Sequence, residues 1–285
     1  MDPFRLAMMG APKKSAPAPK PKPKADTACI GCGTCCRKSG PALHAEDVPL
    51  FASQAFGRGD LVTVRAGELA FDQISGTLQP LAADIVKFGD GRVRNSHGFM
   101  VGSGEEDASQ AQGLSGCRFL VEQPKTPTGE IRGACGIYAH RPIECRVLLC
   151  KDTQAIEALY AQDRLDRAGV LLATFGPDKV GYAKALVELV DVHNEVCSAS
   201  SWHGLLQEIA LLERAMTKAG ADGSASDASQ QERKTALYQD LAEAVRLDAA
   251  YRELAHEKAG VPVEELAFLF GRPLPHIALS YGVRI

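Results

Sequence analysis

The chain has 285 residues, of which 45% are hydrophobic and 24% are charged, and its formal net charge is −3. This composition is typical of a globular protein with an ordinary core, and the length allows one large or two smaller domains. The weak negative balance gives no general signature of nucleic-acid binding. The sequence has no apolar run of about 18 residues, so we expect no membrane-spanning helix.

The start of the chain is a tract of proline, lysine and alanine, over residues 11–25, that can bury almost no apolar surface. We expect residues 1–25 to form a disordered tail, which acts as a flexible tether or as a weak electrostatic arm toward an acidic partner. The apolar run at residues 6–11 is too short and too mixed for a signal peptide. We therefore expect a cytoplasmic protein, in which thiols stay reduced.

The next part of the chain is rich in turn formers and short strand-like pieces. Residues 61–65 have strand character, and residues 84–88 and 92–95 flank a Gly-Asp-Gly turn, which predicts a hairpin. Residues 45–56 predict a helix that Pro49 begins or interrupts.

The rest of the chain has helical composition and spacing. We expect helices over residues 152–173, 180–196, 205–219, 231–259 and 261–270, and an extended end over residues 272–285. The predicted fold class is therefore α+β, mainly helical. It combines an irregular cysteine-rich domain with short strands, at residues 26–151, and a helical domain at residues 152–285.

Cysteines are the most informative feature of the sequence, and eight of the nine lie in the first domain: Cys29, Cys32, Cys35, Cys36, Cys117, Cys135, Cys145 and Cys150. The first three follow a C-x2-C-x2-C spacing, which lets one tight loop direct its thiolates at a single centre. Gly31 and Gly33 allow the left-handed backbone that such a loop needs. We interpret the eight cysteines as metal ligands.

The identity of the metal and the number of centres stay open. The C-x2-C-x2-C spacing favours an iron–sulfur cluster, [4Fe–4S] first, but the C-P continuation of the ferredoxin motif is missing and thiolates also select zinc. Cys36 directly follows Cys35, and on an extended stretch the two side chains would point to opposite faces. We therefore expect Cys36 to face a second metal or to act as a redox thiol. Arg141 and Arg146 are expected to offset thiolate charge.

Four motifs occur in order: C-x-x-C-G-T-C-C at 29–36, C-R-F-L at 117–120, C-G-I-Y-x-x-R-P-x-x-C-R at 135–146 and L-L-C at 148–150. In these motifs the chain resembles the CxxCxxCC (YkgJ-type) family of zinc- or iron-chelating cysteine-cluster proteins. The resemblance covers about residues 27–152 and implies that the eight cysteines bind metal. One branch of that family, the flagellin lysine methylases, further implies a cluster-bearing enzyme that modifies protein.

Other candidate residues are weaker. His44 and His140 are spare candidates for a metal ligand, since imidazole also suits zinc. His193 and Cys197 are four residues apart and could share one helix face. They continue the apolar stripe of Leu186, however, so we interpret both as buried core residues.

Three functions are compatible with these patterns. The first is a metal-binding protein that holds an iron–sulfur cluster or zinc, in a structural or electron-transfer role, and binds a protein partner through its helical region. The second, from the resemblance, is an S-adenosylmethionine-dependent enzyme like the protein-lysine methylases. The third is a redox or metal-handling thiol protein that uses Cys36. We expect neither a nucleic-acid nor a membrane partner.

Overall fold

The computed structural model describes residues 32–72, 77–91, 116–123, 132–149, 152–221 and 228–285. The predicted tail at residues 1–25 and the predicted strand at residues 92–95 lie outside these ranges. The chain is α+β and mainly helical, as the sequence predicts. None of the described helices is both long enough and apolar enough to cross a membrane.

The elements of the first half are short. The described strands are β1 (Leu61–Val64), β2 (Leu69–Asp72), β3 (Thr77–Pro80), β4 (Ile85–Phe88), β5 (Asp90–Gly91), β6 (Gly116–Cys117), β7 (Leu120–Glu122) and β8 (Gly133–Cys135). Helix α1 (Thr34–Lys38) precedes these strands, and helix α2 (Ile143–Val147) follows them. The described residues of this half also form the 3-10 helices η2 (Ala45–Ser53), η3 (Arg58–Asp60) and η5 (Tyr138–His140).

The second half consists of helices of very different lengths. They are α3 (Gln154–Leu159), α4 (Arg167–Phe175), α5 (Val180–Val196), α6 (Ala199–Ala221), α7 (Ala228–Glu257), α8 (Leu266–Phe270) and α9 (Leu274–Ser280). The 3-10 helices η6 (Pro177–Lys179) and η7 (Val263–Glu265) precede α5 and α8. The three long helices α5, α6 and α7 confirm the helices predicted at 180–196, 205–219 and 231–259.

Strands pair two by two in antiparallel ladders: β1 with β4, β2 with β3, β5 with β6 and β7 with β8. The β1–β4 ladder runs from Leu61 opposite Phe88 to Val64 opposite Ile85. The strands predicted at 61–65 and 84–88 are therefore confirmed, and they pair with each other. The predicted helix at 45–56 is the 3-10 helix η2, with Pro49 inside it, since a proline there cannot donate an α-helical hydrogen bond.

The helix predicted over residues 152–173 is wrong as a single element, because the chain breaks it into α3 and α4. Between them Asp163 takes a positive φ of 47°. Leu165 N donates to Leu43 O over 2.9 Å, and Ala45 N donates to Asp163 O over 2.8 Å. This pairing with a distant segment uses backbone groups that a continuous helix would need. Asp166 then caps α4 by accepting from Gly169 N over 2.7 Å.

The extended end predicted over residues 272–285 is also wrong, since α9 occupies its centre. Pro273 is the N-cap residue of α9, and Pro275 stands at its start. A proline is tolerated at these positions because the first N–H groups of a helix have no partner inside it. Leu274, Ile277 and Ala278 are buried, so tertiary packing stabilises a helix whose two prolines stand where they do not break it.

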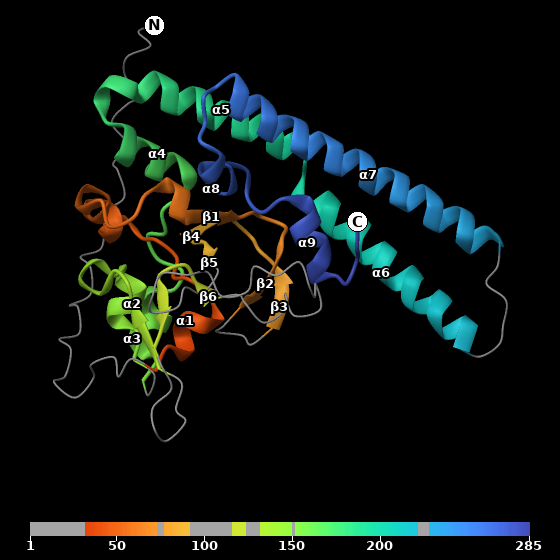
Figure 1. Ribbon diagram of the computed structural model, residues 1–285, viewed down its shortest axis with the longest axis horizontal. Coiled ribbons are helices and arrows are strands. Elements are labelled where there is room, and N and C mark those ends of the chain that lie inside the picture. The colour runs from red at the N-terminus through yellow and green to blue at the C-terminus, as the bar shows by residue number, and fades with distance from the viewer. Residues whose placement is uncertain (1–31, 73–76, 92–115, 124–131, 150–151, 222–227) are drawn as a thin grey trace, which may run out of the picture.

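Two hydrophobic clusters form the core of the described residues. The first combines Leu43, Leu61, Val86, Phe88 and Cys117 of the cysteine-rich half with residues of α4, α5, α7 and α8 of the helical half. The second lies among α6, α7, α9 and the end of the chain, and includes Trp202, Leu206, Leu241 and Ile277. Figure 1 shows the short strands and α1–α3 on one side of the molecule and the α6–α7 pair extending away on the other.

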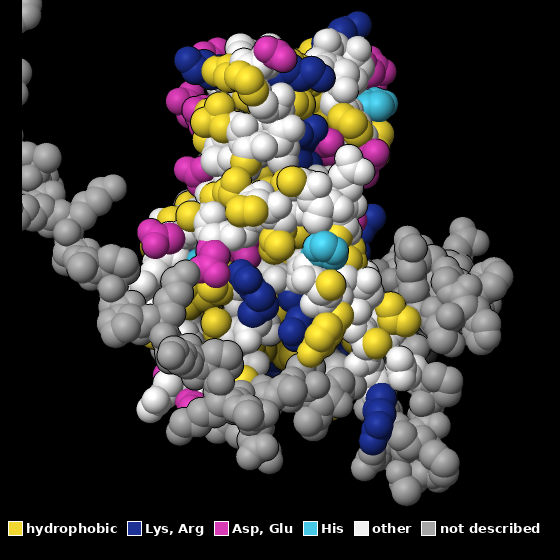
Figure 2. All heavy atoms as spheres, turned by 90° about the vertical axis from the view of Figure 1, so that its left-hand side faces the viewer, with side chains coloured by type: hydrophobic (Ala, Val, Ile, Leu, Met, Phe, Trp, Pro, Cys, Tyr) yellow, Lys and Arg dark blue, Asp and Glu magenta, His cyan; other side chains and the backbone are white. Residues whose placement is uncertain are grey.

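Side-chain types are mixed on the face toward which α2, α3 and α4 lie. Figure 2 shows hydrophobic, basic and acidic side chains interspersed on the part of this face that is not covered by grey atoms. The visible surface there is therefore not dominated by charge of one sign, which agrees with the weak net charge of the chain.

Helix α8 lies at the centre of the first cluster, and Phe268, Leu269 and Phe270 are fully buried. Its last carbonyl groups accept hydrogen bonds from side chains of other elements. Thr63 Oγ1 donates to Phe268 O over 2.5 Å, and Arg167 Nη1 donates to Leu269 O over 2.6 Å. A helix end that is removed from water needs such partners, because its last carbonyl groups have none inside the helix.

The bond between Thr63 and α8 yields a stability prediction. Thr63→Val keeps the shape of the side chain but leaves the buried carbonyl of Phe268 without this donor, so we expect a loss of about 1–3 kcal/mol in the free energy of unfolding. Thr235→Val is the matched control, since exposed Thr235 donates to a carbonyl of its own helix, and it should cost under ~0.5 kcal/mol. Urea unfolding measures both, and equal losses would contradict the role of α8.

Candidate metal centre

Six of the eight predicted ligands lie in the described residues, and none of the six forms a disulfide: Cys32, Cys35, Cys36, Cys117, Cys135 and Cys145. They come from four separate segments, namely α1 with the residues before it, β6, β8 and α2. Cys29 and Cys150 lie outside the described residues. The arrangement of these four segments decides whether the thiols can act together.

Helix α1 begins where Gly33 takes a left-handed conformation, with φ 71° and ψ 2°. Gly33 also lies close to β8, because a Cβ atom on Gly33 would be 3.2 Å from Cα of Gly133. On the β6 side, a Cβ atom on Gly116 would be 3.3 Å from the carbonyl oxygen of Cys36. The three glycines thus allow α1 to pack directly on the strands that carry Cys117 and Cys135.

Arg37 stabilises this packing through two hydrogen bonds, although it was not among the candidates selected from the sequence. Its Nη1 donates to the carbonyl oxygen of Cys32 over 2.9 Å, and its Nη2 donates to that of Arg132 over 3.4 Å. The side chain therefore closes the loop before α1 and attaches it to the segment that leads into β8. A signal was available, because Arg37 directly follows the C-x-x-C-x-x-C-C motif.

The arginines that were selected from the sequence have other contacts. The guanidinium of Arg141 lies 3.6 Å from the ring centroid of Tyr138, and its Nε donates to Tyr138 O. Arg146 pairs with Glu46 over 3.2 Å. These contacts fix the loop around α2 rather than reach toward a sulfur atom.

Cys35 and Cys36 do not lie on an extended stretch, and the expectation that they point to opposite faces is wrong. Both are in α1, and their Sγ atoms are 3.9 Å apart. In a helix, consecutive side chains are about 100° apart and can converge on one side. The separation is close to the edge of ~3.8 Å of a tetrahedron with metal–sulfur bonds of about 2.3 Å.

Electrostatics show that the four segments bring their thiols near one another. Burial, and then the charges of Cys117, Cys135 and Cys35, raise the pKa of Cys145. The hydrogen bond from Cys36 lowers the pKa of Cys35 to about 6 and raises that of Cys36, on which Cys117 and Cys145 also act. Because such interactions weaken with distance, these five side chains share one neighbourhood.

The type of donor fits a thiolate-bound metal, but the described residues do not form a closed metal site. Thiolates suit zinc and iron–sulfur clusters. No group of three or more Cys, His, Asp or Glu side chains within the described ranges is arranged to hold a metal ion. The structure thus gathers candidate ligands without showing the coordination geometry, and two further candidates, Cys29 and Cys150, lie in segments that it does not describe.

Helix α2, which carries Cys145, is held by two carboxylates that were not selected from the sequence. Asp47 accepts from the backbone N–H of Ile143 over 2.8 Å, and Glu144 accepts from that of Ala42 over 2.8 Å. Each segment therefore supplies a carboxylate to the backbone of the other. His44 adds a contact of 3.2 Å from its Nε2 to Glu144 Oε1, which makes it a structural residue.

The other histidines selected from the sequence do not join the thiols. His140 is exposed at the end of η5. His193 is fully buried, and its Nε2 lies 2.9 Å from Asp248 Oδ1. Cys197 is also buried. The interpretation of His193 and Cys197 as core residues is therefore confirmed.

Comparison with known proteins finds no matching family model, no similar curated protein and no similar solved structure. The resemblance to the CxxCxxCC family therefore stays a prediction from the four motifs.

Replacement of Gly33 tests the packing of α1. In Gly33→Ala the new Cβ would lie 2.5 Å from Arg37 Nη1 at a positive φ, so we expect a loss of about 1–2 kcal/mol. In Gly204→Ala, within α6, the Cβ meets no atom within 4 Å, so the same substitution should stabilise the protein by about 0.5–1 kcal/mol. Effects of the same sign in urea unfolding would contradict the role given to Gly33.

The contact between His44 and Glu144 predicts a pH dependence. Burial would by itself lower the pKa of His44, but the bonds to Glu144 and to the Gln162 carbonyl outweigh it and raise the pKa. Asp47 and, through it, Arg146 also face this group. A raised folded pKa gives a stabilisation that is complete below the unfolded value of about 6.5 and is lost as the pH rises through the folded value.

We therefore expect His44→Gln to be more destabilising at about pH 5.5 than at about pH 8.5. Urea unfolding at the two pH values measures the difference from the wild type. His140→Gln, at an exposed position, is the control and should show little dependence on pH. A cost of His44→Gln that grows with pH would refute the assignment.

Proposed function

We propose that this protein binds a soft metal through cysteine thiolates, as an iron–sulfur cluster or as zinc. The observation that carries the proposal is the convergence of thiols from four separate segments, in which Cys35, Cys36, Cys117, Cys135 and Cys145 interact electrostatically. Thiols that only stabilise a core have no need to gather in this way, since each behaves as a small apolar side chain.

The proposed role is structural or electron-transferring, and a bound cluster would supply one-electron redox chemistry. The residues around the thiols contribute rigidity. Arg37 closes the loop that carries Cys32, and Asp47 and Glu144 fix α2. The elements themselves are very short, so a metal that bound all four segments would add cross-links that the backbone pairing lacks.

We also propose that the protein is cytoplasmic, because thiols in the cytoplasm stay reduced and available as ligands. It also assigns recognition of a protein partner to the helical half. Support comes from the layout of the molecule, because the α6–α7 pair extends away from the cysteine-bearing elements (Figure 1) and has a cluster of buried residues of its own.

Metal analysis tests the proposal directly. We expect anaerobically purified protein to contain iron with acid-labile sulfide, or zinc, and an iron–sulfur cluster would add visible absorbance. Protein that holds neither metal, even after reconstitution, would overturn the proposal.

A pair of cysteine variants makes the test specific to the site. We expect Cys145→Ala to reduce the metal content per chain to about half or less, because a ligand position is lost. Cys197→Ala removes a thiol of the same size from the second hydrophobic cluster and should keep the full metal content. If the two variants lose metal equally, the loss reflects general destabilisation, and the assignment of Cys145 as a ligand fails.

A further inference from the structure

Among the described residues, a third helix packs on the α6–α7 pair near the body of the protein and not along the whole pair. Near the body of the protein, α9 packs on it and helps to bury Leu206, Leu241 and Ile277. Helix α9 ends at Ser280, and the chain turns at Gly282, where φ is 77°. Beyond that turn the two long helices continue outward (Figure 1). We call residues 210–221 of α6 and 228–242 of α7 the distal hairpin.

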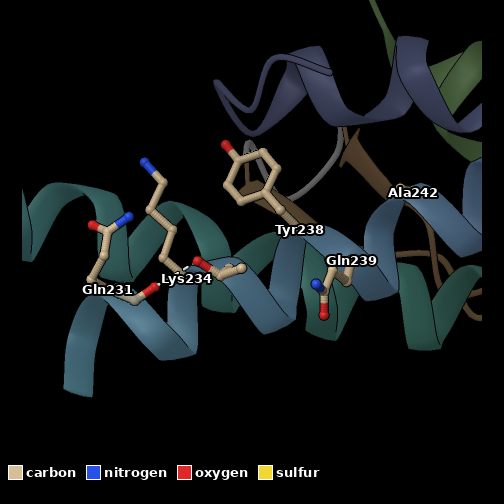
Figure 3. A pocket seen from close by; sticks show the side chains of 6 residues that line it. Gln231, Lys234, Tyr238, Gln239 and Ala242 are labelled. Atoms are coloured by element: carbon tan, nitrogen blue, oxygen red, sulfur yellow. Dashed lines mark hydrogen bonds between the residues drawn. The ribbon is translucent and has the colours of Figure 1, made fainter. Parts of the chain in front are cut away.

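Two surface hollows mark the distal hairpin. One, of about 470 Å³, lies between α6 and the turn after α9 and is lined by Arg214, Lys218 and Tyr281, among others. The other, of about 370 Å³, is lined by α7 residues that include Lys234 and Tyr238. Figure 3 shows these two side chains projecting from α7 on the same side.

A bridge of polar contacts links the two hollows. Lys234 Nζ lies 2.9 Å from Glu213 Oε1, and Tyr238 Oη donates to the same oxygen over 2.9 Å. The bond from Lys234 lowers the pKa of Glu213. Glu213 is the one carboxylate among the described residues that line the hollows, and its charge is offset by Lys234.

The two other charged side chains that line the larger hollow are basic. Arg214 and Lys218 are exposed, one turn apart on α6, and both line the larger hollow. Neither has an ion-pair partner among the described residues. Around them lie the ring of Tyr281 and the side chain of Ala210. The surface therefore combines two available cations with apolar contact area.

We propose that the distal hairpin binds a short, acidic, amphipathic helix of a partner protein. A helix that docks on such a surface buries its apolar face and presents its carboxylates to the cations. The α6 part of the distal hairpin spans about 18 Å at 1.5 Å per residue, which corresponds to a helix of about 12 residues.

An acidic protein helix fits this surface better than a nucleic acid does. Nucleic-acid sites carry clustered basic residues on a domain of high pI, whereas this chain has a net charge of −3. This inference rests on the part of the proposed function that gives the helical half a protein partner. It does not depend on the metal.

Two labelled peptides of about 12 residues test the proposal. Both carry the same leucine face, and the polar face holds glutamate in one and lysine in the other. We expect the glutamate peptide to bind wild-type protein in a fluorescence anisotropy titration, and to bind more weakly as the salt concentration rises. The lysine peptide should not bind. Equal binding of the two peptides, or binding of neither, would overturn the proposal.

Charge variants locate the site. Arg214→Glu with Lys218→Glu should weaken binding of the glutamate peptide by roughly tenfold or more, and the milder Arg214→Gln with Lys218→Gln should give a smaller loss. The matched control is Lys184→Glu with Lys258→Glu, at exposed positions on α5 and just after α7, and it should change the affinity by less than about twofold. An equal loss in the control would contradict the location.

Two further measurements separate the alternatives. If a single-stranded RNA oligonucleotide binds more tightly than the glutamate peptide and the Arg214 and Lys218 variant abolishes this binding, the surface is a nucleic-acid site and the proposal is wrong. Metal content is measured on the same preparations. Metal-free protein that binds the glutamate peptide would leave this inference standing while the proposed metal centre fails.

Discussion

The buried end of α8 imposes a constraint that connects most of the molecule. Its carbonyl groups belong to fully buried residues, and a buried carbonyl without a hydrogen bond is costly. The partners come from three other elements: Thr63 from β1, Arg167 from α4 and Arg252 from α7, which donates to Phe270 O. Because the donors and acceptors are far apart in the sequence, the cysteine-rich half and the end of the chain depend on each other.

The packing of α8 also influences where the thiols lie, through a short series of contacts. Strand β1, fixed by α8, pairs with β4, and Val86 O of β4 accepts from Leu43 N. The segment that begins with Leu43 leads to His44 and Asp47. These two residues hold α2, because His44 contacts Glu144 and Asp47 accepts from the N–H of Ile143. The position of Cys145 is therefore set by backbone pairing and carboxylates that originate outside its own segment.

The proposed metal site and the proposed partner-binding surface lie in parts of the molecule that are stabilised in different ways. The thiols lie on elements of a few residues, whose mutual packing depends on close glycine contacts and on Arg37. The α6–α7 pair has long helices and a cluster of buried residues around Trp202 and Leu206. A metal would thus add most to the part of the fold with the least regular structure, while a partner helix would extend a bundle that already exists.

The sequence by itself determined the mainly helical class, the long helices α5, α6 and α7, and the strands β1 and β4, because periodic burial is a local pattern. It also selected the eight cysteines, through their spacing. Only the tertiary structure decided where the chain departs from local preference. The break between α3 and α4 arises from pairing with a distant segment, and α9 is stabilised by burial against α6 and α7. Cys35 and Cys36 come close because both lie in α1, which packs on the strands β6 and β8. No local pattern in the sequence encodes the contacts between distant segments, which is also why the roles of Asp47 and Glu144 were missed.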